Sequence, residues 1–168
     1  MFLIETPRLL IRRYERGDAE ALHRILSDPA TMSFWPSPFT REQAESWLQR
    51  SLDSYEQFGF GRWALERKAD RQRVGDAGIL QLEIDGKPEY DLGYIIHAPY
   101  WCNGYGAEAA QAILAYGLGE ARLPRLCANM PDDHTASKKV AEKIGMRFEK
   151  KFFNKRNRDK LTCLYVKP

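Results

Sequence analysis

The chain has 168 residues, of which 43% are hydrophobic and 29% are charged, and its formal net charge is +3 at pH 7. This length predicts one domain, over residues 1–168, with enough apolar residues for a core that needs no disulfides or metal ions. The charge is too small to indicate nucleic-acid binding, and no segment is long and apolar enough to span a membrane. Because Cys102, Cys127 and Cys163 form an odd set without metal-ligand spacing, we expect no metal site and a reducing compartment. The amino terminus shows no basic leader followed by a long apolar run, so we expect a cytoplasmic location.

Hydrophobic periodicity and turn residues predict a chain in which strands and helices are mixed. An apolar run at 9–11 favours a first strand, and Asp18 is placed to cap a helix that Pro29 limits. Thr40 and Gln43 form a capping-box pattern ahead of a second helix. The later elements are strands at 63–65, 78–84 and 90–97, a helix ending near 119, a strand at 126–130, a helix over 136–144, and strands at 147–153 and 161–166. The order β-α-α-β-β-β-α-β-α-β-β predicts an α/β (α+β) fold with one mixed sheet and helices against its faces.

The segment 99–109 joins the apolar strand to the following helix through Gly104 and Gly106. Glycines at these positions let backbone N–H groups approach an anion, and the helix start adds a partial positive charge, so the loop suits a pyrophosphate. The dinucleotide fingerprint fits poorly because position 109 is alanine, and no Gly-Lys-Ser/Thr sequence is present. We expect a ligand site between the strands at 90–97 and 126–130, where the connections run apart.

Four segments occur in a characteristic order along the chain. They are residues 6–12 (TPRLLIR), 74–78 (VGDAG), 93–109 (GYIIHAPYWCNGYGAEA) and 134–146 (HTASKKVAEKIGM). In this order they resemble the motifs of the GNAT N-acetyltransferase superfamily, and within it those of the RimJ/RimL-like branch of ribosomal-protein N-terminal acetyltransferases. The resemblance covers essentially the whole chain. It implies a single GNAT-like domain with a wedge between the fourth and fifth predicted strands.

The resemblance also implies where acetyl-CoA would bind. Its pyrophosphate would lie on the amides of residues 102–107, and its pantetheine arm would pair with the strand backbone, where an N–H near Ile95 would face the oxyanion. The cofactor-binding residues implied are Ile95, Ile96, Cys102, Asn103, Gly104, Tyr105, Gly106, Ala107 and His134. Asn103 stands where the family frequently has a lysine, and His134 stands where it has an asparagine that helps to anchor the cofactor arm. We expect these two departures to weaken cofactor binding.

Acetyl transfer to an amine requires a group that takes a proton, because amines are mostly protonated at neutral pH. The candidate bases are Glu83, Asp91 and His97. Ser137 aligns with the serine that resembles a general acid in this branch, and it would protonate the leaving thiolate.

The sequence therefore predicts an acyl-CoA-dependent N-acetyltransferase that acts on a primary amine, with a protein N-terminal α-amine as the first candidate acceptor. A small-molecule amine, such as a polyamine or an antibiotic, is the alternative acceptor. Two other classes stay open: a non-catalytic acyl-CoA-binding regulator, and an RNA-binding domain that would use the basic run at 150–160. The sequence is equally compatible with a monomer and a homodimer.

Overall fold

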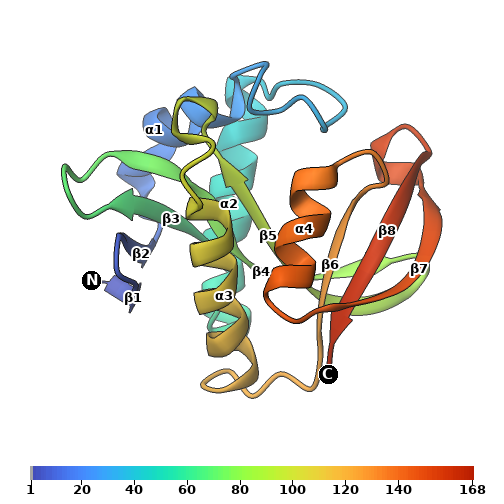
Figure 1. The fold of residues 1–168 in the computed structure, drawn as a ribbon. Helices are drawn as coiled ribbons and strands as arrows, with labels where there is room; N and C mark the ends of the chain where they lie inside the picture. The colour runs from blue at the N-terminus through green and yellow to red at the C-terminus, as the bar shows by residue number, and fades with distance from the viewer. Residues whose placement is uncertain (1) are drawn as a thin grey trace.

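The computed structural model describes residues 2–168 and shows one mixed sheet of eight strands (Figure 1). The strands are β1 (Phe2–Glu5), β2 (Leu9–Arg13), β3 (Arg62–Arg67), β4 (Arg73–Ile84), β5 (Lys87–Ile96), β6 (Leu126–Pro131), β7 (Arg147–Asn154) and β8 (Lys160–Lys167). The α-helices are α1 (Ala19–Leu26), α2 (Arg41–Phe58), α3 (Tyr105–Leu118) and α4 (Thr135–Lys143). Short 3₁₀ helices occur at Arg16–Asp18 (η1), Ala98–Tyr100 (η2) and Lys155–Asn157 (η3). The predicted mixed α/β fold is confirmed, with β1 as an additional strand before the first predicted one.

The strand order is β1-β2-β3-β4-β5-β6-β8-β7, and β5 and β6 are the one parallel pair of neighbours in this sheet. Asp91 of β5 aligns with Cys127 of β6, and the register of the two strands goes no further. The carboxyl-terminal half of β5 therefore has β4 on one side and no strand on the other. We call the space between the diverging strands the wedge (Figure 1).

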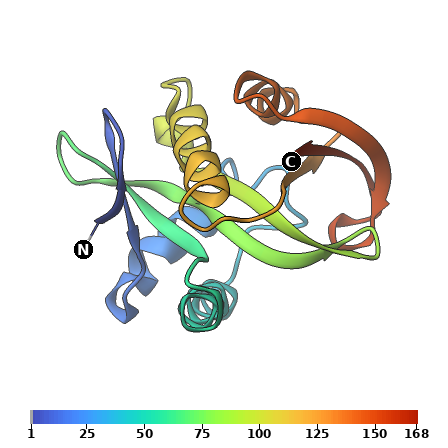
Figure 2. The same ribbon diagram turned by 90° about the horizontal axis from the view of Figure 1, so that it is seen from below.

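Two helices cover each face of the sheet, α1 and α2 one face, α3 and α4 the other (Figure 2). Side chains along a strand alternate between faces. Tyr94 lies on the α3/α4 face, because its ring is 2.8 Å from where a Cβ on Gly106 would lie. Asp91, Gly93 and Ile95 consequently lie on the α1/α2 face. The wedge thus separates two differently lined faces.

The start of α2 follows the predicted capping box. The Thr40 N–H donates to Gln43 Oε1 (2.8 Å), and the Gln43 N–H donates to Thr40 Oγ1 (3.2 Å). Asp18 precedes α1 as predicted, but its side chain does not cap that helix. Its carboxylate instead contacts Arg12 (2.8 and 2.9 Å) and Arg73 (2.8 Å) and accepts the Glu15 N–H (2.8 Å). The two arginines lie far enough away in sequence that the local pattern does not show them.

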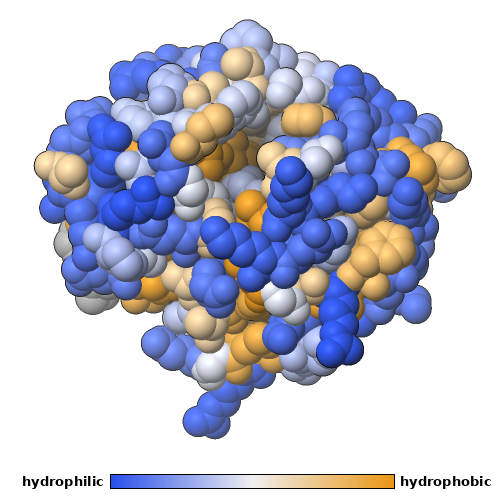
Figure 3. All heavy atoms as spheres, viewed as in Figure 1, coloured by the Kyte–Doolittle hydropathy of each residue, from blue (hydrophilic) through white to orange (hydrophobic). Residues whose placement is uncertain are grey.

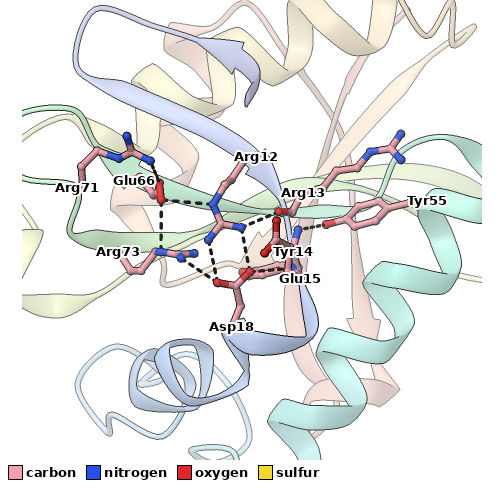
Figure 4. Close-up of polar contacts among 9 residues, drawn as sticks. All are labelled: Arg12, Arg13, Tyr14, Glu15, Asp18, Tyr55, Glu66, Arg71 and Arg73. Atoms are coloured by element: carbon pink, nitrogen blue, oxygen red, sulfur yellow. Dashed lines mark hydrogen bonds and ion pairs between the residues drawn. The ribbon is translucent and has the colours of Figure 1, made fainter. Parts of the chain in front are cut away.

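These contacts belong to a half-buried polar cluster that joins η1 to β2, β3 and β4 (Figure 4). Arg12 also donates to Glu66 (3.3 Å), and Arg71 approaches the same carboxylate (3.2 Å). Burial raises the pKa of Asp18, but the hydrogen bonds from Arg12 and the Glu15 backbone bring it below its ordinary value. The Asp18 carboxylate is therefore held as an anion between Arg12 and Arg73, which fixes η1 against the sheet.

No helix within residues 2–168 is long and apolar enough to cross a membrane. Over the same residues, the structure contains no group of three or more His, Cys, Asp and Glu side chains that could hold a metal ion. The single domain over residues 1–168, the cytoplasmic location and the oligomeric state remain predictions.

Candidate active site

The loop between β5 and α3 presents backbone N–H groups beside the wedge. Gly104 has a φ of +79°, a conformation that favours glycine, and it is the N-cap of α3. The Glu108 N–H donates to Gly104 O (3.1 Å) as the helix begins. The N–H groups of residues 105–107 therefore have no acceptor within the helix, and the helix dipole reinforces them. This geometry fits a phosphate group, as expected from Cys102, Asn103, Gly104, Tyr105, Gly106 and Ala107.

Asn103, where the family frequently has a lysine, shapes this loop. Its Nδ2 donates to Tyr100 O and Trp101 O, both at 3.0 Å. One cation beside the loop is Arg8, whose Nη1 donates to Asn103 O (2.7 Å) and whose Nε pairs with Glu108 (2.7 Å). The Arg8 side chain is 46% exposed, and its Nη2 lies 3.4 Å from where a Cβ on Gly104 would be. Arg8 and Asn103 are 95 residues apart in the chain, so the sequence pattern around Arg8 does not predict this contact.

The free edge of β5 supplies a second set of backbone groups. The His97 N–H donates to Val74 O (2.8 Å), next to the β4 ladder. Since antiparallel bonding alternates along a strand, Ile95 also directs its N–H and C=O to β4, while Tyr94 and Ile96 direct theirs to the wedge. The Ile96 carbonyl accepts a hydrogen bond from Trp101 Nε1 (2.7 Å), so of the two Ile96 backbone groups only the N–H is available to a ligand in the wedge. The backbone contact with the cofactor arm that was expected at Ile95 is therefore available at Tyr94 instead. At Ile96 the expected contact is available through the N–H group.

Asp91 lies at the closed end of the wedge on the α1/α2 face. Its Oδ1 accepts a hydrogen bond from Asn129 Nδ2 on β6 (2.9 Å). Burial raises the pKa of Asp91 to about 7, although the Asn129 hydrogen bond and the Arg62 charge act in the opposite direction. A carboxyl group with this pKa is partly ionised at neutral pH and is suited to accept a proton.

A buried ion pair lies beside Asp91. Asp76 is fully buried and accepts hydrogen bonds from Arg62 Nε (2.6 Å), Trp47 Nε1 (3.0 Å) and the Tyr14 hydroxyl (2.5 Å). The Tyr55 hydroxyl donates to the Arg62 carbonyl. The Tyr14 N–H donates to the Tyr55 hydroxyl (3.1 Å; Figure 4). The pair is thereby attached to the polar cluster at η1.

Ser137 and His134 lie at the start of α4, across the wedge from β5. The Ser137 N–H donates to His134 Nδ1 (3.4 Å), so His134 is the N-cap of α4. The imidazole stacks on Phe34 of the α1–α2 loop, with ring centroids 3.9 Å apart, and burial lowers its pKa. Burial raises the pKa of the Tyr94 phenol, and a hydrogen bond with the Ser137 side chain acts in the opposite direction. The two side chains are therefore close to each other on the α3/α4 face. A histidine fits here because its Nδ1, like an asparagine oxygen, accepts the capping hydrogen bond.

Two of the candidate bases lie away from this arrangement. Glu83 is exposed and pairs in register with Pro88 beside the β4–β5 turn. Asp91 pairs with Leu80, so Glu83 lies roughly 10 Å along the strand from it, in the direction away from the open wedge, and on the opposite face. His97 lies under the α1–α2 loop, 3.9 Å from Asp28, and burial lowers its pKa. Of the three candidate bases, Asp91 is the one that lies where β5 and β6 separate.

The surface is hollowed between the start of α3 and α4, and hydrophobic residues form the floor of the hollow (Figure 3). The amide loop and Arg8 lie on the α3 side, and Ser137 and His134 lie on the α4 side. The residues expected to contact a cofactor thus come from segments that border one opening.

A family model described as an acetyltransferase (GNAT) domain matches residues 8–147. Two Bacillus subtilis proteins are similar over most of their length. The uncharacterized N-acetyltransferase YnaD is 36% identical over 154 residues, which cover 90% of this chain and 86% of that protein. The uncharacterized protein YkkB is 31% identical over 146 residues, which cover 86% and 85%.

Solved structures show the same fold. A GNAT-family acetyltransferase from Bacillus anthracis superposes with a TM-score of 0.81 and 30% sequence identity, over 99% of this chain and 98% of that one. RimL, a ribosomal L7/L12 alpha-N-protein acetyltransferase solved in complex with coenzyme A, superposes with a TM-score of 0.82 at 15% identity, over 99% and 97%. The second similarity is one of fold alone. The family model and the B. subtilis relatives show that the chain belongs to the GNAT family of acetyltransferases.

Proposed function

We propose that this acetyltransferase transfers an acetyl group from acetyl-CoA to a primary amine, foremost the α-amine of a protein N-terminus. The observation that carries the proposal is the distribution of proton-transfer groups about the wedge. Asp91, with a pKa of about 7, lies on the α1/α2 face, and Ser137 lies beside Tyr94 on the α3/α4 face. A donor held in the wedge would have a base on one side and a hydroxyl on the other.

Acetyl-CoA, when bound, supplies an acyl group already activated as a thioester. The N–H groups of the α3 start and the Arg8 guanidinium would hold its phosphates, and the wedge-facing backbone of Tyr94 and Ile96 would hold its arm. Asn103 and His134 would contribute indirectly, since their side chains complete the loop and the α4 cap. The backbone amides therefore carry most of the phosphate binding.

The residues on the two faces would then divide the proton transfers. Asp91 takes a proton from the incoming ammonium, which frees the nitrogen lone pair for attack. Ser137 gives its hydroxyl proton to the departing thiolate as the C–S bond breaks, and it regains a proton from the nitrogen that has formed the new C–N bond; the demand is moderate because a thiol has a pKa of about 8.5. Orientation of the amine by the surrounding side chains supplies the rest of the rate enhancement.

The rim near the start of α4 favours an acceptor with a single positive charge. Asn157 of η3 donates to Phe34 O (2.9 Å), and Lys160, which pairs with Asp133 (3.3 Å), lies 5.5 Å from the Phe34 ring centroid. The exposed side chains of Lys155, Arg156 and Arg158 are part of the same turn. A polyamine would approach these cations unfavourably, whereas a peptide α-amine carries one charge.

Two measurements test the proposal. Acetyl-CoA at about 100 times its dissociation constant stabilises a protein by about 2.7 kcal/mol, so the melting temperature should rise by roughly 5–10 °C. Thiol release with a panel of N-terminal peptides, polyamines and aminoglycosides then identifies the acceptor. A melting shift without thiol release from any amine would indicate a regulator that binds acyl-CoA. No shift would refute both the acetyltransferase and the acyl-CoA-binding regulator.

A further inference from the structure

Arg62 places one guanidinium nitrogen, Nη1, over Gly93 of β5 on the α1/α2 face, the face on which Asp91 lies. We infer that its guanidinium binds the acceptor through an oxygen atom next to the reacting amine, as in the α-amino acyl group of a peptide or an amino-acid amide. The inference rests on the proposed function and narrows its acceptor class.

The sheet gives Arg62 a path across two strands. Arg62 pairs with Gly78 of β4, and Gly78 pairs with Gly93 of β5, so the three residues form one row on the α1/α2 face. A Cβ on Gly93 would lie 2.2 Å from Arg62 Nη1. The guanidinium therefore lies directly over the Gly93 backbone, where a Cβ would displace it.

The buried ion pair holds the guanidinium in this position. Asp76 accepts Nε (2.6 Å) and is itself fixed by Trp47 and Tyr14. The guanidinium carbon also lies 5.1 Å from the centroid of the Trp47 ring. Arg62 as a whole is 4% exposed, so it cannot turn to bulk solvent.

Asp76 leaves part of the guanidinium without acceptors. Nη2 is buried and lies 2.5 Å from Asp76, yet it has no acceptor in hydrogen-bond geometry. Nη1, over Gly93, has no hydrogen-bond acceptor among the side chains of the described residues. An unmet donor on a buried cation, such as Nη2, is unfavourable, and in native proteins it indicates a bound water or a ligand.

The position of Asp91 indicates what that ligand would be. Asp91 precedes Gly93 by two residues on the same face, so its carboxylate and the Arg62 guanidinium lie about 7 Å apart along the strand. An α-amino acyl group places its amine and its carbonyl oxygen three bonds apart. The amine can therefore face Asp91 while the oxygen accepts a hydrogen bond from Arg62. A simple alkylamine has no such oxygen. The repulsion between its ammonium group and the Arg62 guanidinium would therefore not be offset by a hydrogen bond.

The test compares two acceptors that differ in that oxygen, alaninamide and isopropylamine. Thiol release is measured for each, and kcat/KM is expressed per free amine to remove the difference in amine pKa. The wild-type protein should favour alaninamide by at least tenfold, the usual scale for a hydrogen bond to a charged group. Equal values for the two amines would overturn this inference alone. No thiol release from any amine would refute the proposed function, and this inference with it.

Variants then assign the preference to Arg62. Arg62→Lys keeps the charge but lacks Nη1, and Arg62→Gln lacks the charge; both should bring the ratio of the two kcat/KM values near one. Arg50→Gln is the matched control, because Arg50 is exposed and its guanidinium carbon lies 5.4 Å from the centroid of the same Trp47 ring. A preference that survives in Arg62→Lys would refute the assignment.

A binding measurement keeps the inference testable if the Arg62 variants fold poorly. With coenzyme A present, alaninamide should raise the melting temperature of the wild-type protein, and isopropylamine at the same concentration should not. The same shift with both amines would contradict a role for the oxygen atom.

Discussion

Replacing Asp91 by asparagine should make the protein less active and, at neutral and higher pH, more stable. Folding raises the pKa of this carboxyl from 3.8 to about 7, chiefly by burial. The folded protein therefore holds the proton more tightly than the unfolded chain does. Its free energy of unfolding consequently falls as the pH rises from about 4 to about 7 and is constant above that. The difference between the two pKa values corresponds to at most about 4 kcal/mol.

Urea unfolding at pH 5 and at pH 8 measures this pH-dependent change in the free energy of unfolding. Asparagine has nearly the same shape and does not ionise, so the gain in stability from Asp91→Asn should be larger at pH 8 than at pH 5, by up to about 3 kcal/mol. Comparing the variant with the wild type at each pH cancels the other titrating groups. Loss of a general base should lower kcat/KM by about 10²- to 10⁴-fold and remove the rise in rate near pH 7.

Glu83→Gln is the control for this experiment, because it removes an exposed carboxylate from the neighbouring strand. It should leave the rate unchanged. A stability change in Asp91→Asn that is equal at pH 5 and pH 8, or full activity in that variant, would refute the reasoning.

Three further variants address the donor side of the site. Gly104→Val places a branched side chain at a φ of +79°, at a cost of about 1–2 kcal/mol, and should abolish stabilisation by acetyl-CoA while the far-UV circular dichroism is retained. Persistent binding would contradict the role given to the loop. Arg8→Gln should raise the dissociation constant for acetyl-CoA roughly fivefold and flatten its salt dependence in calorimetry, since the lost cation is half exposed. An unchanged salt dependence would show that Arg8 only braces the loop. Ser137→Ala should lower kcat by about 10- to 100-fold with little change in the KM for acetyl-CoA; an unchanged kcat would exclude proton donation by Ser137.

The sequence predicted those features whose causes lie close together along the chain. The capping box at Thr40 and Gln43 is complete within four consecutive residues, and the Gly104 loop lies between an apolar strand and an apolar helix. β1 has four residues, too few to show a periodicity, and its pairing with β2 alone makes it a strand. Local pattern is therefore sufficient for most elements and insufficient for the shortest.

The site departs from prediction where a contact joins distant segments. Arg8 reaches the α3 loop, and Arg62 reaches across β4 to Gly93, so neither role is visible in its own neighbourhood. The change from Ile95 to Tyr94 has a different cause. Alternation shows that the two residues face opposite edges of the strand, but only the register with β4 decides which edge is bonded and which is free.

Asn103 and His134 do not by themselves indicate a protein that has lost its chemistry. Each makes a local hydrogen bond that completes the loop or the α4 cap, and Arg8 places a cation beside the phosphate-binding amides. A regulator that only bound acyl-CoA would have no use for the carboxyl of Asp91, which lowers stability at neutral pH because burial opposes its ionisation. An asparagine would accept a hydrogen bond from Asn129 without that cost. A destabilising group at the point where the strands separate is typical of a site arranged for catalysis.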